Sequence, residues 1–236
     1  MQYAREEQAY LERTVRDFTC VLVKRERVEG DLQDYQYIEM QVREEIRNGD
    51  RVDRPMAIYL RFLAPKAVAG RRVIYVDGRN DGKMLVRNGG KHFDYVVTQI
   101  DPYGESAQRE SLVPVPRSGF IDVLNQMIDV LERHVQADPS GQNTKVQRIP
   151  GAKVNKRPCT VIRITHPQKQ KGLEFHVVNV FVDTELHLPV RVDISEWPAA
   201  AGQPPRLLAE YTYTDLKINV NLPDAAFDPA RLRGNR

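Results

Sequence analysis

The feature that most constrains this chain is its succession of short alternating apolar and polar runs, separated by tight turns. Turn pairs such as Asn48-Gly49, Asp77-Gly78 and Asp81-Gly82 recur along the first half. Such pairs between alternating runs are typical of β-hairpins. Strands joined by turns this short pair antiparallel, because a parallel pair needs a crossover of about a dozen residues or more. The sequence therefore predicts an antiparallel sheet and not a series of βαβ units.

Two segments depart from the period of two and predict helices. Residues 3–17 carry apolar side chains at helical spacing between charged ones. The clearer helix follows Ser118, a candidate N-cap. Its apolar positions recur at intervals of three and four: Phe120, Ile121, Leu124, Met127, Ile128, Leu131 and Val135. We predict one domain over residues 1–236 with an α+β, mainly β fold, in which a large curved antiparallel sheet carries helices packed on its concave face.

Composition excludes several classes of protein. None of the apolar runs approaches the ~18 residues that a membrane-spanning helix needs. The net charge of +3 is too small by itself to indicate nucleic acid, and we expect none as a partner. Cys20 and Cys159 lie in predicted strands among apolar neighbours, which favours buried thiols, although a bond between them is left open. The start, Met1-Gln2-Tyr3, has no signal-peptide pattern, which fits a cytosolic protein or one whose leader has been removed.

Motifs that carry chemistry are missing from the sequence. It has no Gly-x-Ser-x-Gly, no phosphate-binding glycine loop and no His-Glu-x-x-His. His166, His176 and His187 follow one another on predicted strands, where surface histidines are the simpler interpretation and a metal site the alternative. We predict a protein that is not an enzyme, with no catalytic residue, no metal and no cofactor.

The charges of the second half are segregated. Residues 139–173 contain eight Lys or Arg and neither Asp nor Glu. The charged residues of 174–196 are mainly acidic. Opposite charges that pair across neighbouring strands explain this most simply. The alternative is a basic surface for lipid headgroups, an anionic polymer or nucleic acid. The first strand also turns polar at residues 24–27, and residues 101–117, rich in Pro, Ser and Gly, predict a long loop of the length of a lid.

Two stretches resemble a known group of bacterial proteins. Residues 55–65, with 70–78 and 82–86, resemble the pattern of lipoprotein carriers of the LolA and LolB type, in which an Arg-Phe-like pair precedes a Pro and a later strand runs into Asp-Gly. Residues 209–219 and 222–227 resemble the last strand of those carriers. Residues 19–27 look like an uncharacterised bacterial family of the same superfamily. The order of elements carries more of the resemblance than any single motif.

The resemblance implies that the curved sheet is a half-open antiparallel β-barrel. It also implies an exported protein, located in the periplasm or elsewhere outside the cytoplasm. It also implies a partner that is a lipid or the acyl chain of a lipoprotein, with peripheral membrane contact allowed and the oligomeric state left open. A cavity between sheet and helices is an apolar ligand site on physical grounds as well. The residues predicted to line it are Ile38, Met40, Met56, Ile58, Leu60, Phe62, Phe120, Leu124, Met127, Leu131, Val192, Tyr211 and Tyr213. Plain core packing is the competing interpretation for each of them.

Three hypotheses about function follow. The first is a non-enzymatic envelope protein that carries a lipid or a lipidated partner. The second is a structural or adaptor module whose core is filled by its own side chains and whose surfaces bind protein. The third is a hydrolase or metal enzyme that uses the histidine-bearing hairpins.

Overall fold

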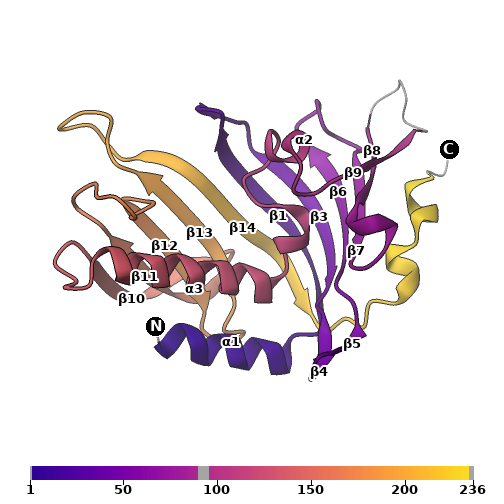
Figure 1. Ribbon diagram of the computed structural model, residues 1–236, viewed down its shortest axis with the longest axis horizontal. Helices are drawn as coiled ribbons and strands as arrows, with labels where there is room; N and C mark the ends of the chain where they lie inside the picture. The colour runs from indigo at the N-terminus through magenta and orange to yellow at the C-terminus, as the bar shows by residue number, and fades with distance from the viewer. Residues whose placement is uncertain (1, 90–95, 234–236) are drawn as a thin grey trace. The chain divides into compact units, whose positions relative to one another are not determined.

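A computed structural model describes residues 2–89 and 96–233 (Figure 1). The helices are α1 (Gln2–Thr14), α2 (Glu105–Gln108) and α3 (Phe120–Ala137), with 3-10 turns η1 (Asn80–Gly82), η2 (Val115–Arg117), η3 (Asp224–Phe227) and η4 (Pro229–Leu232). The strands of the first half are β1 (Asp17–Val28), β2 (Asp31–Leu32), β3 (Gln36–Arg43), β4 (Ile46–Asn48), β5 (Arg51–Arg54), β6 (Ala57–Ala64), β7 (Arg72–Val76), β8 (Met84–Arg87) and β9 (Val97–Ile100). Those of the second half are β10 (Lys145–Val154), β11 (Arg157–Thr165), β12 (Val177–Asp183), β13 (Pro189–Glu196) and β14 (Arg206–Ile218).

Within the described residues, twelve strands form one sheet in the order β10-β11-β12-β13-β14-β1-β3-β6-β7-β8-β9, with β2 beside β1. The strand pairs whose register is described are all antiparallel, as the tight turns predicted. β4 and β5 form a separate two-stranded hairpin. The predicted class, α+β and mainly β with a large antiparallel sheet and helices, is confirmed. None of the helices in the described part of the chain has the length and apolar character needed to cross a membrane.

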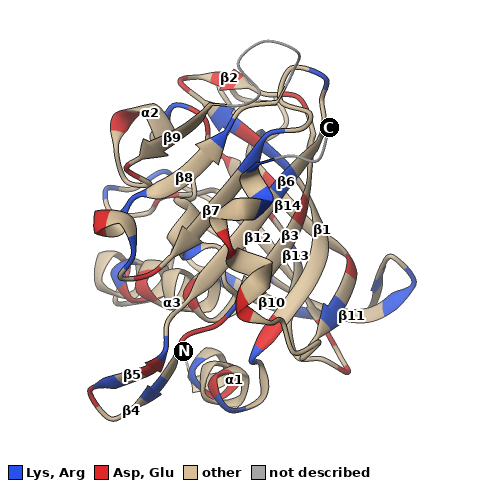
Figure 2. Cartoon of the chain, turned by 90° about the vertical axis from the view of Figure 1, so that its right-hand side faces the viewer, with Lys and Arg blue, Asp and Glu red and all other residues tan. Residues whose placement is uncertain are grey.

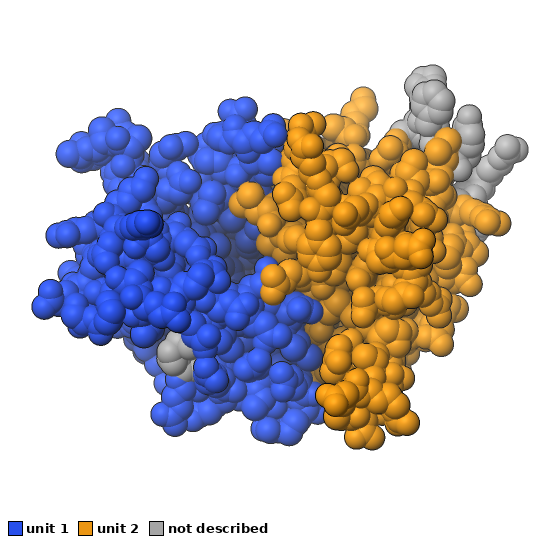
Figure 3. Space-filling view, viewed as in Figure 1, with its two compact units in different colours: residues 1–13, 24–33, 120–212 blue, residues 14–23, 34–119, 213–236 orange. Residues whose placement is uncertain are grey.

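The chain divides into two compact units (Figure 3). Unit 1 comprises residues 1–13, 24–33 and 120–212, and unit 2 comprises residues 14–23, 34–119 and 213–236. β1 and β14 each contribute residues to both units. The single domain predicted from the sequence remains a prediction, and each unit is described by itself below.

In unit 1, α3 lies over β12 and β13 (Figure 1). Alternate residues of the strands face the helix, because side chains of a strand point to opposite faces in turn. The core there consists of Ile164, Phe175, Val178 and Val192. Apolar residues of α3 recur every three to four positions and so present one stripe to that core.

In unit 2, the C-terminal turns η3 and η4 cover one face of β6, β7 and β8. Phe227 and Leu232, 2% and 0% exposed, pack with Tyr59 and Ile74 of the sheet. The Arg231 guanidinium lies over the Tyr59 ring, 3.8 Å from its centroid. The sequence analysis did not predict these turns, since four residues are too few to show a helical period.

Two expectations about loops need comment. Residues 101–117 are not a structureless loop, because α2 and η2 form within them. For residues 92–98 the sequence predicts a strand or the start of a helix; this segment lies partly outside the described residues, and β9 begins at Val97. β10 runs to Val154, beyond the strand that the sequence predicts over residues 145–149, whereas β13 matches the strand predicted over residues 189–195 to within one residue.

Candidate functional site

The candidate site of unit 1 is the apolar layer between α3 and the sheet. Val192 lies opposite Tyr211 in the β13–β14 register, so both side chains point to the same face. From the helix, Met127 and Leu131, one turn apart, pack against the same cluster. The structure therefore brings together four of the predicted lining residues.

Part of this layer is incompletely buried. Six side chains pack against the core of unit 1 yet keep some exposure: Met127, Val130, Leu131, Val180, Ile194 and Tyr211. Leu124 and Phe120, also predicted, are buried at 8% and 0% exposure on α3. Buried residues thus occur along the whole of α3, at Phe120, Leu124, Ile128 and His134, and partly exposed apolar side chains lie between them.

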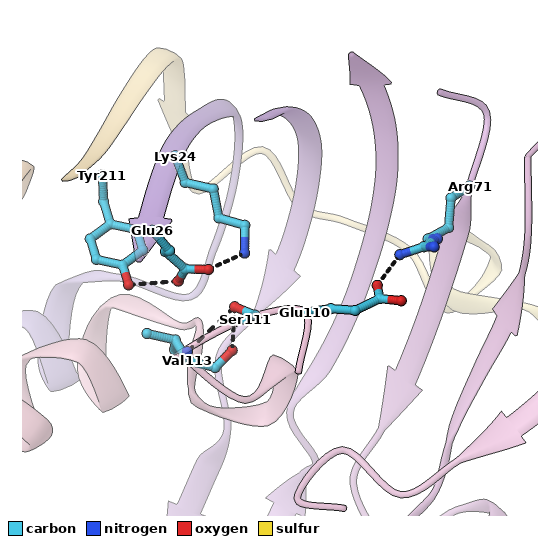
Figure 4. Close-up of polar contacts among 7 residues, drawn as sticks. All are labelled: Lys24, Glu26, Arg71, Glu110, Ser111, Val113 and Tyr211. Carbon is cyan, nitrogen blue, oxygen red and sulfur yellow. Dashed lines mark hydrogen bonds and ion pairs between the residues drawn. The ribbon is translucent and has the colours of Figure 1, made fainter. Parts of the chain in front are cut away.

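A buried polar group joins the apolar layer at Tyr211 (Figure 4). The Lys24 ammonium lies 2.7 Å from Glu26 Oε2, and the Tyr211 hydroxyl donates to Glu26 Oε1 at 2.7 Å. Lys24 and Glu26 are 7% and 3% exposed. Positions 24 and 26 share one face of β1 because they are two residues apart. A charged pair this deep is tolerated because each charge has a partner.

Sequence analysis missed this pair and noted only that the strand turns polar there. The alternation of β1 could have revealed the buried pair. Positions 24 and 26 face the same side of the strand as four buried apolar residues: Phe18, Cys20, Leu22 and Val28. A polar residue on the buried parity of a strand is a candidate for a buried, paired charge.

The remaining predicted lining residues form a second face, in unit 2. The β3–β6 register places Ile38 opposite Phe62 and Met40 opposite Leu60. Ile38, Met40, Ile58 and Leu60 are at most 6% exposed. Phe62 is half-buried, and the Arg71 guanidinium lies 5.5 Å from its ring centroid. Arg71 also forms an ion pair with Glu110 (Figure 4).

Two further predicted residues of unit 2 are buried. Met56 is 7% exposed and contacts the loop before α3, since a Cβ on Gly119 would lie 2.8 Å from its methyl carbon. Tyr213 is 7% exposed, and burial raises the pKa of its hydroxyl. The predicted residues thus fall into two groups, one in each unit, and their role in ligand binding remains a prediction.

The histidines are arranged differently from the expectation. His166 is completely buried, so its interpretation as a surface residue is wrong. Its Nε2 lies 3.0 Å from Nδ1 of His134, which is 3% exposed on α3. Burial lowers the pKa of both imidazoles. Sequence patterns give little indication that His134 and His166 meet, because the two residues are 32 positions apart.

The described part of the chain shows neither a metal-binding cluster nor an activated thiol. Among residues 2–89 and 96–233 there is no group of three or more His, Cys, Asp or Glu side chains that could hold a metal ion. Cys20 and Cys159 are free and buried, as predicted, and burial raises the pKa of both thiols. A thiol with a raised pKa is a poor nucleophile.

The fold and the two apolar faces define an α+β protein built on a large antiparallel sheet. The chain belongs to the family described as "Protein of unknown function (DUF1571)", whose model matches residues 15–233. A search of curated proteins found none that matches.

Solved structures that match are distant in sequence. One is the MucA/MucB complex of Pseudomonas aeruginosa, with 14% identity and a TM-score of 0.51, covering 98% of this chain and 61% of that one. A putative outer membrane lipoprotein-sorting protein domain from Vibrio parahaemolyticus has 11% identity and a TM-score of 0.45, covering 98% and 97%. The LolA superfamily protein NE2245 from Nitrosomonas europaea has 10% identity and a TM-score of 0.40, covering 98% of each chain. LolA superfamily proteins are thus among the structural neighbours.

Proposed function

We propose that this chain is a non-enzymatic protein of the bacterial cell envelope that binds a lipid, or the acyl chain of a lipidated partner, in unit 1. The observation that carries the proposal is the partly accessible apolar layer between α3 and the sheet, in which Met127 and Leu131 face Val192 and Tyr211. The extracytoplasmic location rests on the resemblance of the sequence to envelope lipoprotein carriers.

The energetics support an acyl chain as ligand. Burial of each CH₂ contributes about 0.8 kcal/mol, so a twelve-carbon stretch contributes roughly 10 kcal/mol before costs. Association costs an estimated 4–15 kcal/mol in lost motion. At the lower end of that cost about 6 kcal/mol remains, which corresponds to a Kd of tens of micromolar, provided that the layer opens without losing its own packing. A carrier needs such an affinity, because it must also release its ligand.

A second candidate function is an adaptor that binds protein. The structure of MucB in complex with MucA(peri), whose fold this chain resembles with a TM-score of 0.52 and 13% identity, supports it. In that case the apolar layer is ordinary core, and the partner binds elsewhere.

Native mass spectrometry after gentle purification, followed by titration with the fluorescent fatty acid parinaric acid, separates the two candidates. Leu131→Gln should weaken parinaric acid binding, since it places an amide in the apolar layer. Val135→Gln is the matched control, because Val135 lies on the same helix and is 56% exposed. A protein that carries no lipid and binds no parinaric acid supports the adaptor, and equal loss in both variants contradicts the assigned site.

A further inference from the structure

β10 is the outermost strand at one end of the sheet and pairs with β11 along one side. Six exposed cations lie on this strand, on its hairpin turn and in the loop after β11. We call them the basic edge: Lys145, Arg148, Lys153, Lys156, Lys169 and Lys171.

The basic edge is not neutralised within its unit. Arg148 lies 5.8 Å from the centroid of the Tyr3 ring, but none of the six forms an ion pair with any residue that the structure describes. The other two basic residues of 139–173 are Arg157 and Arg163. Arg157 pairs with the carboxylates of Asp183 and Glu185. Arg163 donates to the Asn179 amide at 2.7 Å.

Of the five acidic residues in 174–196, Asp183 and Glu185 pair with Arg157 of this stretch, as expected, whereas Glu174, Asp193 and Glu196 lie beside other arginines. Glu174 pairs with Arg133 at 2.7 Å, Glu210 with Arg191 at 3.1 Å and Glu196 with Arg206 at 3.7 Å. Arg191 also lies 3.7 Å from Asp193. The expected pairing of opposite charges across neighbouring strands therefore holds for Arg157 and is wrong for the basic edge, whose six positive charges form no ion pair with the described residues. Figure 2 shows Lys and Arg in blue and Asp and Glu in red along the chain.

We propose that the basic edge docks unit 1 onto an anionic lipid bilayer. At about 3.3 Å per residue, the three basic-edge residues of β10, from Lys145 to Lys153, extend over roughly 26 Å, a length suited to several headgroups at once. Val146 and Ile149 are 65% and 37% exposed on the same strand. Aliphatic side chains between cations are typical of surfaces that enter the boundary between headgroups and acyl chains.

Two other anionic partners fit the strand less well. An acidic peptide that adds as a strand needs a regular row of backbone donors. β10 interrupts that row with Pro150, which has no N–H, and with a register shift between Ile149 and Ala152. Single-stranded nucleic acid is bound through stacking on aromatic side chains. Residues 139–173 contain no Phe, Tyr or Trp.

The test is co-sedimentation of the full chain with vesicles of phosphatidylcholine alone or mixed with phosphatidylglycerol, at low and high salt. The protein should bind the mixed vesicles at low salt, release them at high salt and ignore phosphatidylcholine alone. Lys145→Glu/Lys153→Glu/Lys156→Glu should weaken binding by about tenfold or more. The matched control, Lys66→Glu/Lys83→Glu/Lys217→Glu, makes the same charge change at exposed lysines of unit 2 and should retain binding.

The proposal is overturned if mixed vesicles do not bind, or if both triple variants lose binding equally, since net charge alone then explains the effect. Preferential binding to polyglutamate or to single-stranded DNA also overturns it in favour of that partner. The outcome is independent of the proposed function, because parinaric acid binding should be unchanged in the basic-edge variant.

Discussion

Acidification should destabilise unit 1 through the buried histidine pair. The Glu174 N–H donates to His134 Nε2 at 3.1 Å, so the proton of a neutral His134 is on Nδ1 and points to His166 Nε2. The proton of His166 is then on Nδ1, facing the Asn143 carbonyl at 3.2 Å. Thr144 Oγ1 also lies 3.3 Å from that nitrogen and donates to Asp138. Every ring nitrogen is thus satisfied in the neutral state, and an added proton would oppose a donor to a donor.

The direction of the pH effect on stability follows from the linkage between proton binding and folding. Burial lowers the pKa of both imidazoles in the folded protein, with the neighbouring imidazole adding to the effect at His134. Asp138, which faces His166, and Glu174, which faces His134, oppose the shift, whereas Arg133 and His176 reinforce it. The unfolded chain therefore binds more protons than the folded one below about pH 6.5, and stability is complete above that pH and falls below it. The limiting slope is about 1.4 kcal/mol per pH unit for each histidine, or about 2.7 for the pair.

Urea unfolding followed by fluorescence measures this effect. Trp197 is the single tryptophan and lies in unit 1, where its indole N–H donates to the His166 carbonyl at 2.9 Å. The unfolding free energy should fall between about pH 7 and pH 5, and His134→Leu/His166→Phe should flatten the curve. His187→Gln is the control, since the side chain of His187 is 44% exposed beside Glu7 and the slope should persist. A flat wild-type curve, or a slope unchanged in the double variant, would refute the reasoning.

Three further substitutions test the packing. Lys24→Met should cost about 3–5 kcal/mol because it removes the cation beside the buried Glu26 carboxylate, which keeps the hydrogen bond from Tyr211, whereas Lys24→Met/Glu26→Leu should recover most of that loss in urea unfolding. Asp183→Ala removes an acceptor of two backbone N–H groups and a guanidinium, and should lower the unfolding free energy by about 3 kcal/mol or more, with Asp183→Asn intermediate; a change below about 1 kcal/mol would contradict this. Gly119→Ala brings a Cβ to 2.6 Å from a Glu44 oxygen, so thermal unfolding should show a loss of about 1–3 kcal/mol, and an unchanged midpoint would contradict the packing.

The sheet and α3 were predictable because their signals are local and repeated. A period of two along strands such as β3 and β6, and the turn pairs between strands, determine which face each residue takes. Phe120 to Val135 show the helical period over four turns, which a strand cannot imitate.

The features that the sequence did not reveal depend on contacts between distant residues. His134 and His166 meet because α3 crosses the sheet, and Glu26 and Tyr211 are 185 positions apart. Polar residues are exposed on average, so a buried Lys24 is visible only when strand parity is followed through the polar segment. The charge segregation was visible, but its meaning depended on β10 being the edge strand, which sequence order does not reveal.

The central claim is that the layer between α3 and the sheet of unit 1 accommodates an acyl chain. Methyl NMR during titration with a spin-labelled stearate tests it most directly. The account predicts strong broadening of the Met127 and Leu131 methyl signals and little effect on Val135, which is exposed on the same helix. Uniform or absent broadening at Met127 and Leu131 would contradict the claim.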